Sequence, residues 1–503
     1  MRFPTHGKFA GAGMEERQML ISDRYPYLDF QCHVYGECFR GTAYVDTGFN
    51  GGIVVPESCW SRLWPVYAEE SMVLGDGSAT VTPSWRGLVR IGDQSFQVRV
   101  VCIGDEFIIG REVIDRARLC LHNGEHLVLD FDGPDPRLRP CIFRLTPYLP
   151  GKPIEEVKRE LGLDDVIKMA SNENVLGPSP KAIEAIRNLA PEVFYYPEGS
   201  APELRKALAE KWSVTPEQVI LGNGSDELLV YIGLAVLNPG DQIIQADPTF
   251  SEYRYVATLC GAEVVSIPMK DLTHDLAAMK EAVTGRTKLL FIANPNNPTG
   301  AIVTRQEVET LWDGLPQHVT VVFDEAYSEY AESEDYPDGL QYVREDRNVI
   351  VLRTFSKAYA LAGLRVGYAI ASEEIVGYLN KLRQPFNVNS VAQAAAVASL
   401  RDTDQVPRTQ KLNSEGKRYL CEEFDRLGLK YAPSDANFIF VDTGKDSKEV
   451  FQALMQKGVI VRTGDIFGYP THIRVTIATP AMNQRFIREL KTALHTDPAN
   501  AQR

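Results

Sequence analysis

The sequence has little that would suit it to a membrane, to export or to nucleic acid. No apolar run approaches the roughly 20 residues that a membrane-spanning helix needs. Residues 1–13 lack the apolar core of a signal peptide. Acidic residues outnumber Lys and Arg by 67 to 53, whereas nucleic acid is held by clustered cations. We therefore expect a cytoplasmic protein that binds neither nucleic acid nor a membrane.

Closely spaced cysteine pairs are also missing. The eight cysteines contain no Cys-x-x-Cys spacing, so we expect no zinc site and no other metal. Most of them lie in the first third of the chain. Without an export signal, we expect reduced thiols there and not disulfides.

The chain instead contains two stretches of different character, and its 503 residues predict more than one domain. After an extension at residues 1–19, residues 20–131 show short apolar segments between turns, which is typical of an all-β domain. Residues 132–143 hold several prolines, which stop both helices and central strands, so we interpret them as a linker.

From residue 144 to residue 503, helical patterns alternate with short apolar strands. The helices include residues 180–189 and 201–212, and the strands are expected at residues 218–221, 242–245, 288–293, 319–323 and 349–353. This alternation predicts an α/β fold with a mainly parallel sheet covered on both faces. Ligands of such sheets bind beyond the carboxyl ends of the strands, so polar residues that follow the strands are the candidate site.

Two of these polar clusters suit a phosphate. Gly222-Asn223-Gly224-Ser225-Asp226-Glu227 opens an apolar helix, whose first N–H groups attract anions, although an ordinary helix cap would look the same. Thr354-Phe355-Ser356-Lys357-Ala358-Tyr359 is followed by Arg365. Its two hydroxyls and the guanidinium suit a phosphate, and the Lys357 amine lies in small and apolar surroundings that favour a nucleophile.

Two further clusters suit a planar ring. In Asn294-Pro295-Asn296-Asn297-Pro298-Thr299-Gly300, the prolines fix a turn that presents the Asn297 amide at a constant position. Asp324 directly follows an apolar strand. It could cap the next helix, or it could face a ring nitrogen and keep it protonated.

Residues 145–493 resemble the histidinol-phosphate aminotransferases, a branch of the fold-type I pyridoxal-phosphate enzymes. The matching motifs occur in the same order along the chain as in that family. Besides the four clusters above, they are residues 144–148, 169–174, 196–198, 248–253 and 474–477. It implies a large domain at about residues 195–380 and a smaller C-terminal α+β domain at about residues 381–495, which the N-terminal arm joins. It further implies pyridoxal 5'-phosphate as cofactor, a homodimer, and transamination of histidinol phosphate with 2-oxoglutarate in histidine biosynthesis.

The resemblance also implies roles for single residues. Lys357 would carry the cofactor as a Schiff base and move the proton, and Asp324 would pair with the ring nitrogen. Asn297 and Tyr327 would bind the ring hydroxyl, and Tyr253 would stack on the ring.

The remaining roles are binding roles. The cofactor phosphate would be surrounded by Ser225, Asp226, Thr354, Ser356 and Arg365. Tyr196 would reach it from the neighbouring subunit. The substrate-binding residues would be Arg474, Arg462, Tyr148 and Asn174.

The sequence departs from the family pattern at Val175, Ala360 and Glu198, where Pro, Gly and Asp are common. An aromatic amino-acid aminotransferase or a phospho-amino-acid decarboxylase on the same scaffold is the alternative. A second alternative is a peptide-binding or proteolytic module with a degenerate transferase domain.

The first domain resembles one lobe of the retropepsin-like aspartic proteases. The resemblance rests on Tyr44-Val45-Asp46-Thr47-Gly48 and on Phe107-Ile108-Ile109-Gly110-Arg111. Aspartic proteolysis needs two carboxylates that share a proton, and this chain supplies only Asp46. We expect a non-catalytic domain, and the alternative is peptidase activity from two Asp46 side chains in a dimer.

Overall fold

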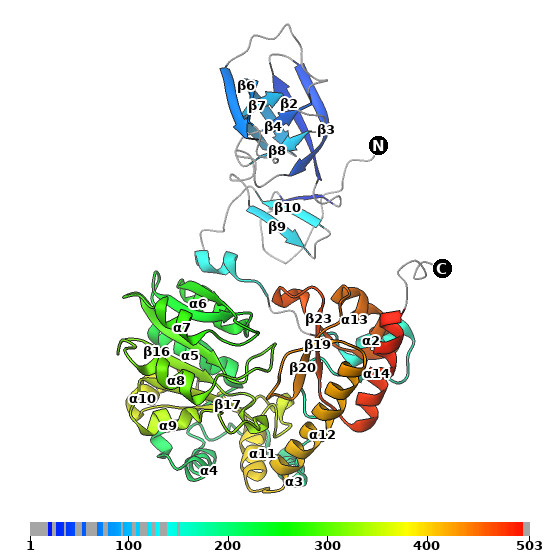
Figure 1. Ribbon diagram of the computed structural model, residues 1–503. Helices are drawn as coiled ribbons and strands as arrows, with labels where there is room; N and C mark the ends of the chain where they lie inside the picture. The colour runs from blue at the N-terminus through cyan, green and yellow to red at the C-terminus, as the bar shows by residue number, and fades with distance from the viewer. Residues whose placement is uncertain are drawn as a thin grey trace. The chain divides into compact units, whose positions relative to one another are not determined.

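The computed structural model describes residues 19–22, 27–34, 37–45, 53–56, 68–73, 79–91, 94–102, 107–110, 118–122, 126–130, 138–147 and 151–495. Asp46 and Tyr148 lie outside these residues. The chain divides into two compact units, Met1–Phe143 and Arg144–Arg503 (Figure 1). Within the described ranges, a helix with the length and apolar character to cross a bilayer does not occur.

The described elements of the first unit are strands, apart from the short 3-10 helix η2 (Pro140–Arg144) at its end. Its larger sheet has the order β2-β3-β8-β4-β7-β6-β5, and β2 also pairs with β6, so the sheet curves back on itself. These strands are β2 (Tyr27–Val34), β3 (Glu37–Val45), β4 (Ile53–Val55), β5 (Ala68–Val73), β6 (Ala79–Ile91), β7 (Gln94–Cys102) and β8 (Ile108–Ile109). A three-stranded antiparallel sheet joins β1 (Met19–Ser22), β10 (His126–Asp130) and β9 (Arg118–His122). In β6, Trp85 and Val89 are buried and Arg86 and Arg90 are exposed, which is the period-two pattern of a half-buried strand.

The second unit contains a seven-stranded sheet in the order β12-β18-β17-β16-β15-β13-β14. Its strands are β12 (Val219–Gly222), β13 (Gln242–Asp247), β14 (Glu263–Pro268), β15 (Thr287–Ala293), β16 (Thr320–Asp324), β17 (Val349–Thr354) and β18 (Gly367–Ile370). Every neighbouring pair is parallel except the two that β18 makes. The predicted mainly parallel sheet is therefore confirmed, and β14 and β18 are strands that the sequence pattern did not indicate.

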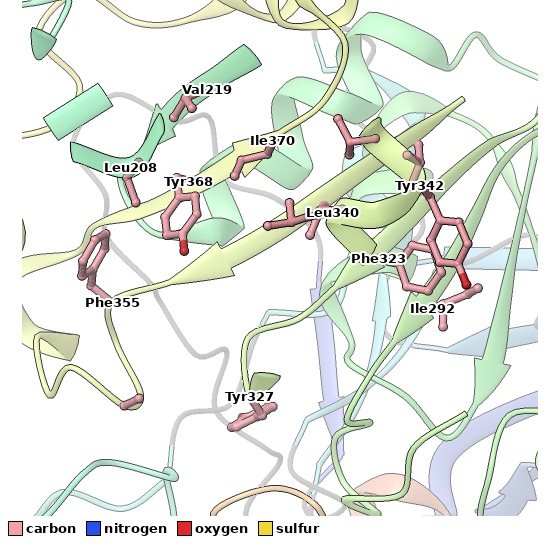
Figure 2. Packing of buried hydrophobic residues seen from close by; sticks show 14 of the residues in the cluster. Leu208, Val219, Ile292, Phe323, Tyr327, Leu340, Tyr342, Phe355, Tyr368 and Ile370 are labelled. Carbon is pink, nitrogen blue, oxygen red and sulfur yellow. The ribbon is translucent and has the colours of Figure 1, made fainter. Parts of the chain in front are cut away.

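Helices cover both faces of this sheet because alternate strand residues point to opposite sides. Val322 of β16 packs with α5 (Ser225–Val236), α6 (Glu252–Cys260) and α10 (Glu373–Leu382). Val321 and Phe323 belong to the other core cluster, shown in part in Figure 2. There Phe323 stacks on Tyr342, with ring centroids 5.7 Å apart. The helices of that face are α3 (Pro180–Leu189), α4 (Pro202–Trp212), α7 (Leu276–Glu281), α8 (Arg305–Trp312), α9 (Gly339–Arg344) and α11 (Ser390–Leu400).

The last part of the chain forms a smaller antiparallel sheet in the order β19-β20-β23-β22. The strands are β19 (Lys430–Tyr431), β20 (Phe438–Asp442), β22 (Arg462–Thr463) and β23 (His472–Thr476). It packs with α12 (Gln405–Arg426), α13 (Ser447–Gln456) and α14 (Pro480–His495). The N-terminal arm also belongs here: β11 (Ile167–Lys168), after α2 (Ile154–Leu161), pairs in parallel with β21 (Val459–Ile460).

Candidate active site

A cavity of about 480 Å³ lies at the carboxyl ends of β15, β16 and β17, and strands β22 and β23 also contribute to its wall. It brings together most of the residues that the sequence indicated. These are Ser225, Asp226, Tyr253, Asn297, Asp324, Tyr327, Thr354, Ser356, Lys357, Arg365, Arg462 and Arg474.

Asp324 ends β16 as a buried carboxylate that is held on both oxygens. The Tyr253 hydroxyl donates to its Oδ2 at 2.7 Å, and the Ala326 backbone N–H donates to its Oδ1 at 3.2 Å. Burial raises the pKa of Asp324 to about 6, although both hydrogen bonds favour the charged form. A cationic N–H that faced this carboxylate in the cavity would relieve the cost of burying its charge.

Lys357 and Tyr327 lie close together beyond the ends of β17 and β16. The Lys357 ammonium is 3.3 Å from the carbonyl oxygen of Ser171 and 5.6 Å from the centroid of the Tyr327 ring. The Tyr327 hydroxyl accepts from the Asn172 side-chain amide at 2.9 Å. Its own proton therefore stays available for an acceptor in the cavity.

Asn297 is oriented by an arginine from the other sheet. Arg474 of β23 donates to the Asn297 side-chain oxygen and, at 2.7 Å, to the Ala170 carbonyl oxygen. This leaves the Asn297 NH₂ group to donate into the cavity. The preceding Asn296 is buried and accepts from the Thr249 hydroxyl at 2.8 Å, which fixes the turn.

Four groups lie together in the cavity wall, and we call them the phosphate cup: the N-terminus of α5 at Ser225, and the side chains of Thr354, Ser356 and Arg365. The Thr354 hydroxyl donates to Ser356 Oγ at 3.0 Å, and Arg365 approaches the same oxygen at 3.5 Å. Gly224, at φ 84°, precedes the helix, and a Cβ there would overlap the Arg365 guanidinium. Backbone N–H groups at a helix start, hydroxyls and a guanidinium are the donors that a phosphate needs.

Asp226 lines the cavity beside the phosphate cup. Its carboxylate makes an ion pair with Arg365 at 2.9 Å. A carboxylate repels a phosphate, so the Asp226 side chain can serve an anion only through the arginine that it holds.

Arg462 and Arg474 face each other across β22 and β23, where their Cα atoms are direct antiparallel partners. Residues opposite each other in such a pair project to the same side of a sheet. Both side chains line the cavity, so two cations lie together in its wall.

Three predicted residues make contacts that the sequence did not indicate. Tyr253 lines the cavity, but its side chain is fully buried, with one ring face stacked on Phe291 at 4.5 Å between centroids and its hydroxyl donating to Asp324. Tyr196 is 83% exposed and stacks on Phe386 outside the cavity wall. Asn174 donates to the Ala358 carbonyl oxygen at 2.8 Å and also lies outside the wall.

The sequence interpretation left out several residues that line the cavity, among them Phe250, Asn172 and Glu252. Phe250 belongs to the same short motif as Tyr253, and Asn172 to the same motif as Asn174. The motifs were therefore informative, but the choice of residue within each of them needed the fold.

Comparison with known proteins gives consistent matches over the second unit. Residues 164–490 match the family model described as aminotransferase class I and II. A histidinol-phosphate aminotransferase of Moorella thermoacetica is 55% identical over 360 residues, which are 71% of this chain and 93% of that protein. Histidinol-phosphate aminotransferase 2 of Carboxydothermus hydrogenoformans is 49% identical over 358 residues, 71% of this chain and 99% of that protein.

Among solved structures, the histidinol-phosphate aminotransferase of Sinorhizobium meliloti in complex with pyridoxal-5'-phosphate is similar. It matches with a TM-score of 0.67 at 28% identity, covering 72% of this chain and 99% of that chain.

Proposed function

This chain belongs, through residues 164–490, to the class I and II aminotransferases, and we propose that its two substrates are histidinol phosphate and 2-oxoglutarate. It is a pyridoxal-phosphate-dependent aminotransferase. The observation that carries the proposal is the pair Arg462 and Arg474 in one cavity wall. Guanidinium groups bind phosphate and carboxylate in the same bidentate way, so one site can take a phosphorylated donor and a dicarboxylate acceptor in turn.

Pyridoxal 5'-phosphate fits the residues of the cavity. When bound, the cofactor supplies an electron sink for negative charge at the substrate's α-carbon. The phosphate cup would hold its phosphate, and Asp324 would keep its ring nitrogen protonated. Asn297 and Tyr327 would donate to the ring hydroxyl, because their other hydrogen-bonding atoms are used by Arg474 and Asn172. Lys357 would hold the cofactor covalently and then move the proton from the substrate's α-carbon.

We assign the stacking position over the cofactor ring to Phe250 and not to Tyr253. A side chain that covers a bound ring has an open face when the ring is absent, and Phe250 lines the cavity and is only partly buried. The Tyr253 side chain, by contrast, is fully buried and stacks on Phe291. Its hydroxyl serves instead to hold Asp324.

A homodimer is the proposed assembly. Residues 193–196 form an apolar and aromatic run, with exposures of 60% for Val193 and 72% for Phe194 and similar values for the two tyrosines. Contiguous exposed apolar residues of this kind are typical of a protein interface. Tyr196 in this run would then reach the phosphate cup of the second subunit.

Donor turnover tests the proposed function. With 2-oxoglutarate as acceptor, histidinol phosphate should be transaminated with a higher kcat/KM than phenylalanine, and Lys357→Ala should abolish multiple turnover of both donors. A preference for phenylalanine would favour an aromatic aminotransferase. Release of CO₂ from a phosphorylated amino acid, without an amino acceptor, would favour a decarboxylase.

For the first unit we propose a retropepsin-like fold. The supporting observation is the pairing around β8: β3, which leads toward Asp46, is parallel to β8, and β4 is antiparallel to it. A non-catalytic role is the preferred reading. Peptidase activity is tested by incubation with an unfolded protein as substrate. If the unit is a peptidase, the substrate should be cleaved only by the dimer, and Asp46→Asn should abolish the cleavage while transamination is unchanged.

A further inference from the structure

The carboxylates of the cavity wall differ in their partners. Among the described residues, four carboxylates line it: Glu173, Asp226, Glu252 and Asp324. Glu173 pairs with Lys168 at 2.6 Å, and Asp226 pairs with Arg365. Asp324 accepts from Tyr253 and Ala326. Each of these three therefore has a cation or strong donors of its own.

Glu252 is the exception within the described part of the chain. It is partly buried, and its one side-chain hydrogen bond there is a long one, at 3.5 Å from the Ser251 hydroxyl. Burial raises the pKa of Glu252, and the nearby charge of Asp226 acts in the same direction. The carboxyl thus lies in the cavity wall with its capacity to accept hydrogen bonds largely unused.

Glu252 lies in the chain between two residues that contribute to the active site. It is the first residue of α6, between Phe250, which lines the cavity, and Tyr253, which holds Asp324. An acidic residue in the first turn also stabilises a helix through the helix dipole. That role alone would not distinguish one amino donor from another.

We propose that Glu252 accepts the ring N–H of the donor's imidazole and thereby selects donors that carry such a ring. The inference rests on the proposed function. The guanidinium groups of Arg462 and Arg474 suit the phosphate of the donor, whereas an imidazole N–H needs an acceptor and a positively charged imidazole needs an anion. The two arginines only donate and cannot supply either, Lys357 is the residue that would hold the cofactor, and the other three carboxylates already have partners.

A comparison of the two amino donors of the reaction cycle shows whether Glu252 recognises the imidazole ring or contributes equally to every donor. Glutamate, which returns the amino group in the reverse direction, carries a second carboxylate where histidinol phosphate carries the ring. A ring acceptor contributes nothing to glutamate, and its charge disfavours that carboxylate. Loss of Glu252 should therefore change the two half-reactions differently within one active site.

The experiment uses the holoenzyme and follows each half-reaction by the absorbance change of the bound cofactor, once with histidinol phosphate and once with glutamate. Glu252→Leu should lose about 10- to 100-fold in kcat/KM for histidinol phosphate, the range for one hydrogen bond to a charged group. Its kcat/KM for glutamate should stay within about threefold of wild type or rise. Glu252→Gln keeps a side-chain oxygen as acceptor and should recover much of the loss.

Glu173→Gln is the matched control, because it alters a cavity carboxylate that is already paired, and it should change both donors alike. Equal losses for both donors in Glu252→Leu, or no loss for either, would overturn the assignment of Glu252 while the proposed function stands. A wild-type enzyme that does not transaminate histidinol phosphate would overturn the proposed function and this assignment with it. Unchanged cofactor absorbance and thermal midpoint in the Glu252 variants verify that the fold is intact.

Discussion

At the scale of single residues, Asp324 combines burial with a fixed orientation. Its side chain is 6% exposed, and both oxygens accept hydrogen bonds from groups at fixed positions. Asp324→Asn keeps the shape but removes the charge that would hold the ring nitrogen protonated. The variant should fold normally and lose several orders of magnitude in single-turnover rate. A loss of only a few-fold, with an unchanged circular dichroism spectrum, would indicate that Asp324 acts only as a helix cap.

Asp324 should also give the cofactor-free protein a measurable pH dependence. Burial raises the pKa of this carboxyl from 3.8 to about 6 in the folded state. Between these values the folded protein holds a proton that the unfolded chain has released, so stability falls as pH rises from about 4 to about 6. The loss is at most about 3 kcal/mol, since one pKa unit corresponds to about 1.4 kcal/mol.

Urea unfolding of the cofactor-free protein at pH 4 to 7 measures this effect, and Asp324→Asn is its reference. The difference in unfolding free energy between wild type and variant should decrease as pH rises through this window. If the difference in unfolding free energy between wild type and Asp324→Asn did not change with pH, burial would not be raising the pKa of Asp324.

Ala360 has a left-handed backbone, with φ at 57°, and its N–H donates to the Lys357 carbonyl oxygen at 3.0 Å. A side chain in this conformation costs roughly 1–2 kcal/mol, which glycine avoids, although glycine gains entropy in the unfolded chain. Ala360→Gly should therefore raise the free energy of unfolding by about 0.5–1 kcal/mol. Ala358→Gly, at a neighbouring position outside the left-handed residues, is the control and should lower it.

At the scale of elements, a buried ion pair joins the two strands that carry the main site residues. Glu325 follows Asp324 at the end of β16, and Arg353 precedes Thr354 on β17. The Arg353 guanidinium donates to Glu325 at 2.8 Å and lies 4.1 Å above the Trp212 ring. Both side chains are almost fully buried, at 5% and 0% exposure.

Arg353→Met should destabilise the protein by about 3–5 kcal/mol, because it leaves a buried carboxyl without its cation. Adding Glu325→Gln should recover part of this loss. Arg286→Met removes an exposed pair with Glu263, where water screens the charges, and should cost far less. If Arg353→Met and Arg286→Met lowered the free energy of unfolding in urea by the same amount, the buried pair of Arg353 with Glu325 would contribute no more to stability than an exposed pair.

At the scale of the whole molecule, the proposed homodimer makes each active site depend on two chains. Tyr196→Ala and Lys357→Ala should each impair activity when the variant is alone. When the two variants are coexpressed, about half of the dimers are mixed, and each mixed dimer has one site with both native residues. Activity should then recover to about a quarter of wild type. No recovery, in a preparation shown to contain mixed dimers, would mean that Tyr196 serves the site of its own chain or none.

Much of the fold of the second unit was accessible from the sequence. Strands β12, β13 and β15–β17 are buried on both faces, and each contains a run of two to five consecutive apolar residues that local sequence can reveal. Strand β14 lies at the edge and is only half-buried. Strand β18 has four residues and begins with glycine, so neither strand carries a clear periodic signal.

The sequence by itself determined the residue types of the site, because Lys357, Asp324, Asn297 and Arg365 lie in short motifs whose chemistry is local to the chain. Only the tertiary structure decided which neighbour within a motif meets the cavity. Phe250 lines it with a partly buried side chain, whereas Tyr253 is fully buried against Phe291, and Asn172, not Asn174, meets Tyr327, 155 residues away. The pairing of Arg462 with Arg474 likewise depends on the register of β22 and β23. The physical reason is that a motif fixes chemistry and spacing along the chain, whereas side-chain direction follows from packing between segments far apart in sequence.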